Sequence, residues 1–299
     1  MIISYKDLMS SQASNQFTLG RIIDVSYQPN KVLVIILCAV LILSLGWSLF
    51  TTGRIIQSLF FSFIQTILVF LCWAIGRELD PDHDYAAFFG IVLLFLPYSL
   101  AQGSVFVLFW FLISLRLINQ TTGESFTSVD VFVYVFLSVI AAILSTGFLL
   151  LPLTILIIFV ASILSKNEVS YILLSIPLLP LFILLYVLNR QSFALLNPTL
   201  PLLLFLGFSC ILLFFVTMTT KEVTCTGDHS FNQLSTKKVQ SAQLIALISV
   251  LLISTVHGNV QMVFPVWAAI TGIGIYRLIY VMYAKIKPAN PTWNNFNNS

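Results

Sequence analysis

Groups that could carry chemistry are concentrated in one short segment, Arg77-Glu78-Leu79-Asp80-Pro81-Asp82-His83-Asp84. Carboxylate oxygens are the ligands that Mg²⁺ and Ca²⁺ prefer in proteins, so Glu78, Asp80, Asp82 and Asp84 are candidate metal ligands. A cation such as Mg²⁺ held there could bind a pyrophosphate or a lipid phosphate. His83 would then be free to act as a general acid or base.

The same residues also have two interpretations that involve no ligand. Asp80 followed by Pro81 is typical of a helix start, with the aspartate as N-cap and the proline at the first helical position. Asp82 and Asp84 would then lie in the first turn, where negative charge complements the helix dipole. The sequence favours this capping role, with metal or phosphate binding second and a docking surface third.

Three arginines are candidates for binding a phosphate or a lipid headgroup. Arg116 ends an apolar run and is followed by Asn119, Thr121, Thr122 and Glu124. It could pair with Asp80 or Asp82, bind a lipid phosphate or assist catalysis beside His83, or it could extend to the bilayer edge as an ordinary interfacial arginine.

The other two arginines are Arg77 and Arg277. Arg77 opens the acidic segment, where it could equally mark the end of a membrane span. Arg277 lies inside the last apolar run, and a charge within a membrane segment is a functional hypothesis by default.

The composition identifies the elements that must position these groups. Hydrophobic residues make up 59% of the 299 residues and charged residues only 8%, against roughly 25% in a soluble domain. The apolar runs are continuous and do not alternate, which excludes a β-barrel and leaves helices as the membrane-spanning elements. The sequence therefore predicts an all-α, polytopic transmembrane helical bundle.

Six apolar runs are clear spans: Val32–Phe50, Ile55–Gly76, Tyr171–Leu188, Leu200–Met218, Ala242–Val256 and Met262–Ala284. Two longer runs, Tyr85–Ile118 and Val129–Ser165, exceed a single crossing. The first holds 34 residues, about 50 Å as one helix against a hydrocarbon core of about 30 Å. Polar residues and turn formers interrupt both runs, so each is predicted to form two short helices that cross or re-enter the membrane, giving about ten membrane segments.

The charges follow this threading. All eleven acidic residues, and eleven of the fourteen lysines and arginines, fall on one side. The positive-inside bias predicts that this side is the cytoplasm, with both termini there and the protein in the plasma membrane. The expected organisation is a cytoplasmic segment over residues 1–31, a transmembrane bundle over 32–287 and a flexible tail over 288–299.

A parallel four-plus-four internal repeat is suggested by two similar loop segments. Thr122-Gly123-Glu124-Ser125-Phe126 resembles Thr226-Gly227-Asp228-His229-Ser230-Phe231 with one insertion. Parallel repeats occur in transporters. The matches are short, and coincidence in an apolar background is the alternative.

Three functions follow from these patterns. The first is a non-catalytic membrane component that presents cytoplasmic loops to the bilayer and to membrane-protein partners. The second is a divalent-cation-dependent enzyme acting on a lipid phosphate at the cytoplasmic face, and the third is a transporter of an uncharged or lipidic solute. Basic residues are scattered singly along the chain, so nucleic acid is not an expected partner.

Overall fold

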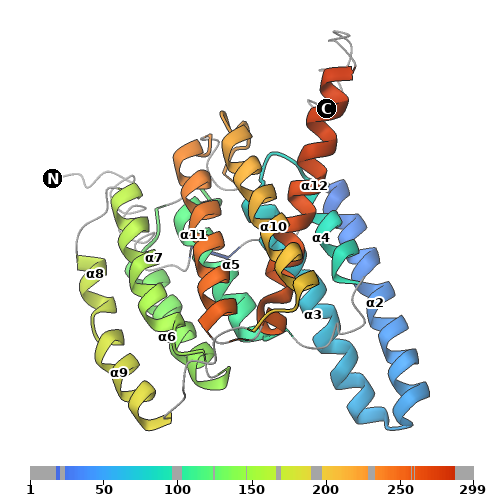
Figure 1. Ribbon diagram of the computed structural model, residues 1–299, viewed down its shortest axis with the longest axis horizontal. Coiled ribbons are helices and arrows are strands. Elements are labelled where there is room, and N and C mark those ends of the chain that lie inside the picture. The colour runs from blue at the N-terminus through green and yellow to red at the C-terminus, as the bar shows by residue number, and fades with distance from the viewer. Residues whose placement is uncertain are drawn as a thin grey trace, which may run out of the picture.

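The computed structural model describes residues 18–20, 24–95, 103–123, 125–145, 147–165, 170–189, 197–227, 233–256, 258 and 260–286. This part of the chain is a bundle of helices without β-strands (Figure 1). The elements are α2 (Gln28–Thr52), α3 (Ile55–Leu79), α4 (Ala86–Leu94), α5 (Val105–Asn119), α6 (Ser128–Leu144), α7 (Leu150–Ser165), α8 (Ser170–Ser175), α9 (Leu178–Asn189), α10 (Leu200–Thr219), α11 (Thr236–Val256), η2 (Val260–Val263) and α12 (Phe264–Ile286).

Among the described residues, five helical segments are long and apolar enough to cross a membrane: α2, α3, α10, α11, and η2 together with α12. Their outer faces carry large hydrophobic side chains, such as Phe50, which is 87% exposed, and Ile56, which is 85% exposed. Apolar surface of this extent is typical of a membrane interaction surface. The structure thus confirms a helical architecture that fits an integral membrane protein.

The two long apolar runs are each divided, as the sequence predicts. The first contains α4 and α5, and the second contains α6 and α7. The run Tyr171–Leu188, expected as one span, is instead broken into α8 and α9 at Ile176 and Pro177. A proline lacks the amide hydrogen and clashes with the preceding turn, which explains the break. The tail over 288–299 and most of the segment 1–31 lie outside the described residues.

The interior of the bundle is formed by α3, α5, α11 and α12. Residues 71–80, at the end of α3, are all buried. Gly90 of α4 and Gly272 of α12 lie at a close helix crossing, where a Cβ added to Gly272 would fall 2.2 Å from the backbone nitrogen of Gly90. Small residues allow membrane helices to approach this closely, and the crossing fixes α4 against α12.

Hydrogen bonds between helices add to this packing. Trp110 donates its indole N–H to Thr154 across 2.9 Å, and Thr154 donates to Ser138 across 2.8 Å. On the other side of the bundle, Trp267 donates to Ser254 across 3.0 Å. These bonds join α5 to α6 and α7, and α11 to α12, and they satisfy polar groups that have no access to water.

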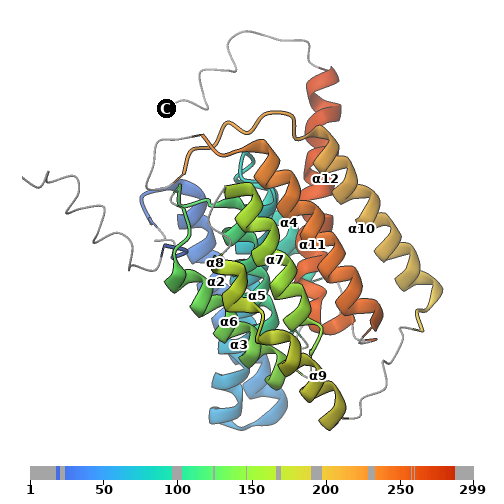
Figure 2. The same ribbon diagram turned by 90° about the vertical axis from the view of Figure 1, so that its left-hand side faces the viewer.

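From α2 to α7 and from α10 to α12 successive helices alternate in direction, whereas α9 continues in the direction of α8 (Figure 1). The start of α2 and the end of α12 lie at the same end of the bundle. At this end lie residues 24–27, 77–85, 119–123 and 220–227, which we call the polar face. The pair α8 and α9 runs along the outer side of α6 and α7 (Figure 2). The polar face therefore collects loops from widely separated parts of the sequence.

Candidate functional site

The turn between α3 and α4 lies at the centre of the polar face. Asp80 ends α3, with its amide donating to the carbonyl of Gly76, and α4 begins only after Tyr85. The prediction that Asp80 caps the start of the following helix is therefore wrong. The carboxylates of Asp80 and Asp82 bind partners elsewhere in the turn and in other loops, and these contacts override the local capping preference.

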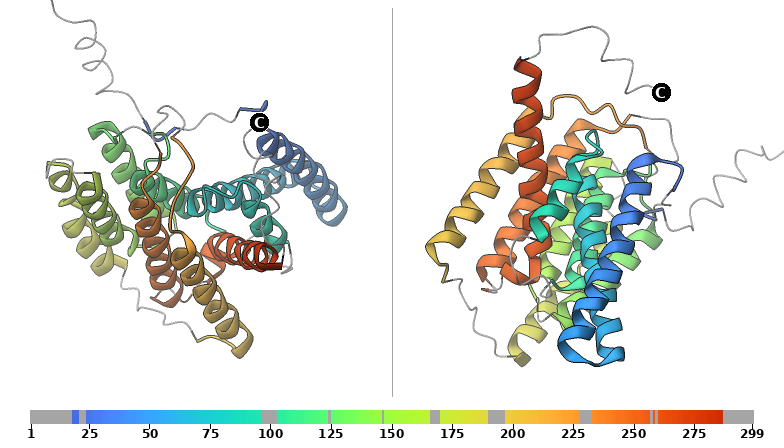
Figure 3. Two further views of the ribbon diagram at one scale, coloured as in Figure 1. Left: turned by 90° about the horizontal axis from the view of Figure 1, so that it is seen from above. Right: turned by 90° about the vertical axis from the view of Figure 1, so that its right-hand side faces the viewer.

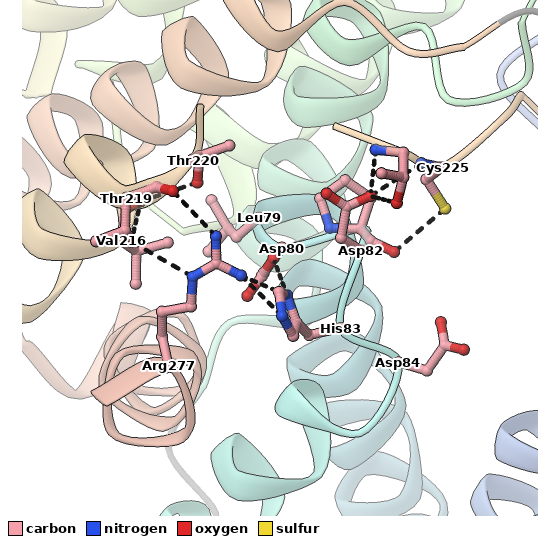
Figure 4. A network of polar contacts seen from close by, with 12 residues as sticks. Leu79, Asp80, Asp82, His83, Asp84, Val216, Thr219, Thr220, Cys225 and Arg277 are labelled. Carbon is pink, nitrogen blue, oxygen red and sulfur yellow. Dashed lines mark hydrogen bonds and ion pairs between the residues drawn. The ribbon is translucent and has the colours of Figure 1, made fainter. Parts of the chain in front are cut away.

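Asp80 orients His83. The carboxylate of Asp80 is 3% exposed and its Oδ1 lies 3.0 Å from Nδ1 of His83. Arg277 of α12 approaches the same ring, with its Nη1 2.8 Å from Nε2 of His83 (Figure 4). Nη1 of Arg277 also lies 2.7 Å from Nδ1 of His83, so the guanidinium sits against both ring nitrogens.

Two tyrosines complete the surroundings of His83. The rings of Tyr276 and Tyr280 meet the imidazole edge-on, with centroids 5.8 and 4.9 Å away. A cavity of about 640 Å³ opens beside these residues, and Asp82, Asp84 and Glu222 are also among its lining residues. A base held by a buried carboxylate at the rim of a cavity is an arrangement suited to proton transfer.

Asp82 fastens the segment between α10 and α11 to the central turn. Its Oδ1 accepts from the backbone N–H groups of Thr224 and Cys225, each at 2.9 Å, and from the hydroxyl of Thr224 at 3.2 Å (Figure 4). The thiol of Cys225 in turn donates to the carbonyl of Pro81 across 3.3 Å. This carboxylate is therefore a link between loops.

Asp84 connects the same turn to α2 and α3. It forms an ion pair with Arg77 and accepts a hydrogen bond from the hydroxyl of Tyr27. Arg77 is thus held by a carboxylate seven residues further along the chain.

Glu78 is the partner of Arg116. Nε of Arg116 donates to Oε1 of Glu78 across 2.9 Å, and its Nη1 donates to the carbonyl of Leu19 across 3.1 Å. The predicted pairing of Arg116 with Asp80 or Asp82 is therefore wrong. Those two carboxylates turn toward His83 and toward Thr224, whereas Glu78 lies on the side of α3 that faces α5.

A second cavity, of about 360 Å³, lies on this side of the turn. Arg77, Glu78 and Arg116 line it together with apolar residues of α3 and α5. Arg116 and Asp82 therefore border different cavities, one on each side of the turn.

The four candidate metal ligands do not converge. Glu78, Asp80, Asp82 and Asp84 contact Arg116, His83, the 224–225 backbone and Arg77 respectively. Figure 4 shows Asp80, Asp82 and Asp84 pointing in different directions. Within the described ranges, no three side chains of His, Cys, Asp or Glu are grouped so that they could hold a metal ion. These four carboxylates therefore do not form one ligand set.

Several residues of the site were not found from the sequence. Thr224, Gln243 and Tyr280 are polar residues in ordinary contexts, and nothing in their neighbourhood signals a contact with the turn. Gln243 donates to the carbonyl of Leu79 across 2.7 Å from inside α11. Only the spacing of Tyr276 and Tyr280, one helical turn apart around Arg277, could have indicated a shared surface.

The fold and this site define a helical protein of membrane type, in which hydrogen bonds and ion pairs join the loops of the polar face. Comparisons with family models, curated proteins and solved structures give no match to this chain.

Proposed function

We propose that the protein is a non-catalytic, multi-pass component of the plasma membrane that presents its polar face to the cytoplasm. About ten segments cross or re-enter the bilayer in this proposal, and both termini are cytoplasmic. The lipid bilayer and other membrane proteins are the partners. This topology is supported by the segregation of the charged residues and by the position of the start of α2 and the end of α12 at the same end of the bundle.

The observation that carries the proposal is the way the loop carboxylates are used. Glu78 binds α5, Asp82 binds the segment 224–225, and Asp84 binds Arg77 and Tyr27. Each contact joins the central turn to another part of the polar face. Charges used in this way build a fixed surface, and the exposed side chains on it, such as those of Lys221 and Glu222, are available for a partner.

Manganese binding tests the non-catalytic role against the metal-dependent enzyme. Mn²⁺ titration of the purified protein, followed by electron paramagnetic resonance, should show no saturable site. The variant Asp80→Asn/Asp82→Asn should give the same titration curve as the wild-type protein. Saturable binding that disappears in this variant, with unchanged expression, would overturn the proposal in favour of a metal enzyme.

The topology is tested separately by cysteine labelling. Thr52 and Glu222 are exposed at opposite ends of the bundle. In a background without native cysteines, a membrane-impermeant maleimide should reach Thr52→Cys in intact cells, and Glu222→Cys only after permeabilisation. The reverse pattern would place the polar face outside.

The length of α4 refines the topology. Its nine residues extend about 14 Å, roughly half the hydrocarbon thickness. We therefore propose that α4 enters the membrane only to mid-depth before the chain continues to α5. Solute transport and the parallel four-plus-four repeat stay predictions of the sequence.

A second candidate function is favoured by the pair Asp80 and His83. His83 and Arg277 border the cavity of about 640 Å³, and the buried carboxylate of Asp80 contacts the imidazole of His83. This set could transfer a proton during cleavage of a lipid phosphate without a metal. The test is phosphate release from phosphatidic acid vesicles by the reconstituted protein. Phosphate release by the wild-type protein that is lost in His83→Gln supports the enzyme. A rate of release equal to that of vesicles without protein excludes it.

A further inference from the structure

The cavity between α2, α3 and α5 has apolar walls and charged residues at one end, as expected of a site for an amphiphilic ligand. Its volume is about 360 Å³. Phe70, Phe109 and Ile113 form apolar walls, while Arg77 and Arg116 lie at the end of the cavity that belongs to the polar face. Seen from above, α2 lies at the edge of the bundle against α3, so this cavity is peripheral (Figure 3).

Two residues that line the cavity have buried polar atoms without a partner. Among the described residues, the indole Nε1 of Trp73 has no hydrogen-bond acceptor and Oε2 of Glu78 has no donor. Trp73 is 7% exposed and Glu78 is 1% exposed. A buried donor or acceptor without a partner costs about 1–3 kcal/mol, so each of these atoms calls for a ligand or an ordered water.

The unpartnered atoms differ in what they require. Trp73 Nε1–H can only donate, which suits an anionic oxygen, and Oε2 of Glu78 can only accept, which suits a cationic N–H. Arg116 uses Nε and Nη1 in its contacts with Glu78 and Leu19. A guanidinium has five N–H donors, so Arg116 can also donate to an anion in the cavity.

We propose that this cavity binds the headgroup of a phospholipid that carries both a phosphate and a primary ammonium group. The phosphate contacts Arg116 and the indole N–H of Trp73, and the ammonium donates to Oε2 of Glu78. The acyl chains leave along Phe70 and Phe109 toward the bilayer. This inference depends on the proposed function in one respect: the polar face must lie at a membrane surface.

The chemistry separates this headgroup from others. A choline headgroup has no N–H and cannot satisfy Oε2 of Glu78. A glycerol headgroup supplies no positive charge to that carboxylate, and a serine headgroup places a second carboxylate next to it. The arrangement therefore favours phosphatidylethanolamine over lipids with the same acyl chains and other headgroups.

Native mass spectrometry of the delipidated protein in detergent tests the site. The probes are phosphatidylethanolamine, phosphatidylcholine, phosphatidylglycerol and phosphatidylserine with matched acyl chains. Because a hydrogen bond to a charged group is at stake, we expect phosphatidylethanolamine to bind about tenfold more tightly than the others. Glu78→Gln should remove this preference.

Trp73→Phe provides a second variant, because Glu78→Gln leaves Arg116 without its charged partner and can impair folding. Phenylalanine keeps an aromatic ring in place and removes only the indole N–H, so affinity for phosphatidylethanolamine should fall about tenfold. Trp47→Phe is the matched control, because Trp47 is 57% exposed in α2 and is not a lining residue of the cavity. Its lipid binding should equal that of the wild-type protein.

Three results would overturn the inference: equal binding of the four lipids, unchanged binding in Trp73→Phe, or displacement of the lipid by soluble phosphoethanolamine at equal concentration. The last result would assign the site to a free phosphate compound. Because the measurement is made in detergent, it does not depend on the orientation of the polar face. A failed topology test and a failed lipid test are therefore distinguishable.

Discussion

The crossing of α4 and α12 supports a quantitative prediction about Gly272. A Cβ at this position would lie 2.2 Å from the nitrogen and 2.6 Å from the Cα of Gly90. Both are backbone atoms, so no side chain can rotate away. Ordinary contact begins at 3.4 Å, so the two backbones must separate by the difference, 1.2 Å.

The cost of this separation is that of an overpacked core, because α4 and α12 are in contact along the length of α4. Overpacking by one methyl group typically costs about 1–3 kcal/mol. The helix preference of alanine over glycine offsets up to about 1 kcal/mol of this cost. The same change at Gly207 of α10 introduces no contact within 4 Å. Gly207→Ala therefore gains the helix preference of alanine without the cost of overpacking.

We therefore expect Gly272→Ala to lower the free energy of unfolding and Gly207→Ala to leave it unchanged or to raise it. Both can be measured by titration with dodecyl sulfate in mixed micelles, with helical circular dichroism as the signal. Arg277 lies five residues beyond Gly272, about 7.5 Å along the helix, so the shift also moves its guanidinium relative to His83. Equal stability of the two variants would refute the close crossing.

Two further predictions concern the loop contacts. Asp82→Ala removes three hydrogen bonds to residues 224 and 225. Because the segment should then open more often, we expect alkylation of Cys225 to become about tenfold faster. An unchanged alkylation rate would contradict the link. The buried carboxylate of Asp130 accepts hydrogen bonds from the N–H and the hydroxyl of Thr18, at 2.8 and 2.7 Å. Asp130→Asn should therefore release residues 18–20 and speed tryptic cleavage near the N-terminus. The control is Asp24→Asn, since Asp24 is exposed and its side chain accepts from Ser26, two residues away.

The fold was largely predictable because bilayer thickness and hydropathy constrain helix length. Five apolar runs correspond to the long helices α2, α3, α10, α11 and α12, and the splits within 85–118 and 129–165 follow from the length of those runs. The break at Pro177 was missed, since membrane helices often contain prolines without breaking. The start of α2 at Gln28 was also missed, because the helix extends beyond its apolar run and includes Lys31.

The position of the site was predictable, and its contacts were not. The acidic segment 77–84 does form the centre of the polar face. Its partners lie far away in sequence: Arg116 is 38 residues from Glu78, Thr224 is 142 residues from Asp82, and Arg277 is 194 residues from His83. Pairing over such separations depends on how the helices pack, which local patterns do not encode.

The end of α3 explains why these partners converge. The C-terminus of a helix carries partial negative charge, and here two buried carboxylates, Glu78 and Asp80, are added to it. A buried charge without compensation costs several kcal/mol, so cationic groups from other helices are required. Arg116 supplies one directly, and Arg277 supplies the other through His83.

This compensation is incomplete on both sides of the turn. Oε2 of Glu78 and Oδ2 of Asp80 are buried and accept no hydrogen bond from the part of the chain that the structure describes. Glu78 borders one cavity, and His83, the partner of Asp80, borders the other. A ligand that supplies a hydrogen-bond donor would therefore bind favourably at Oε2 of Glu78, which supports the lipid site at the end of α3.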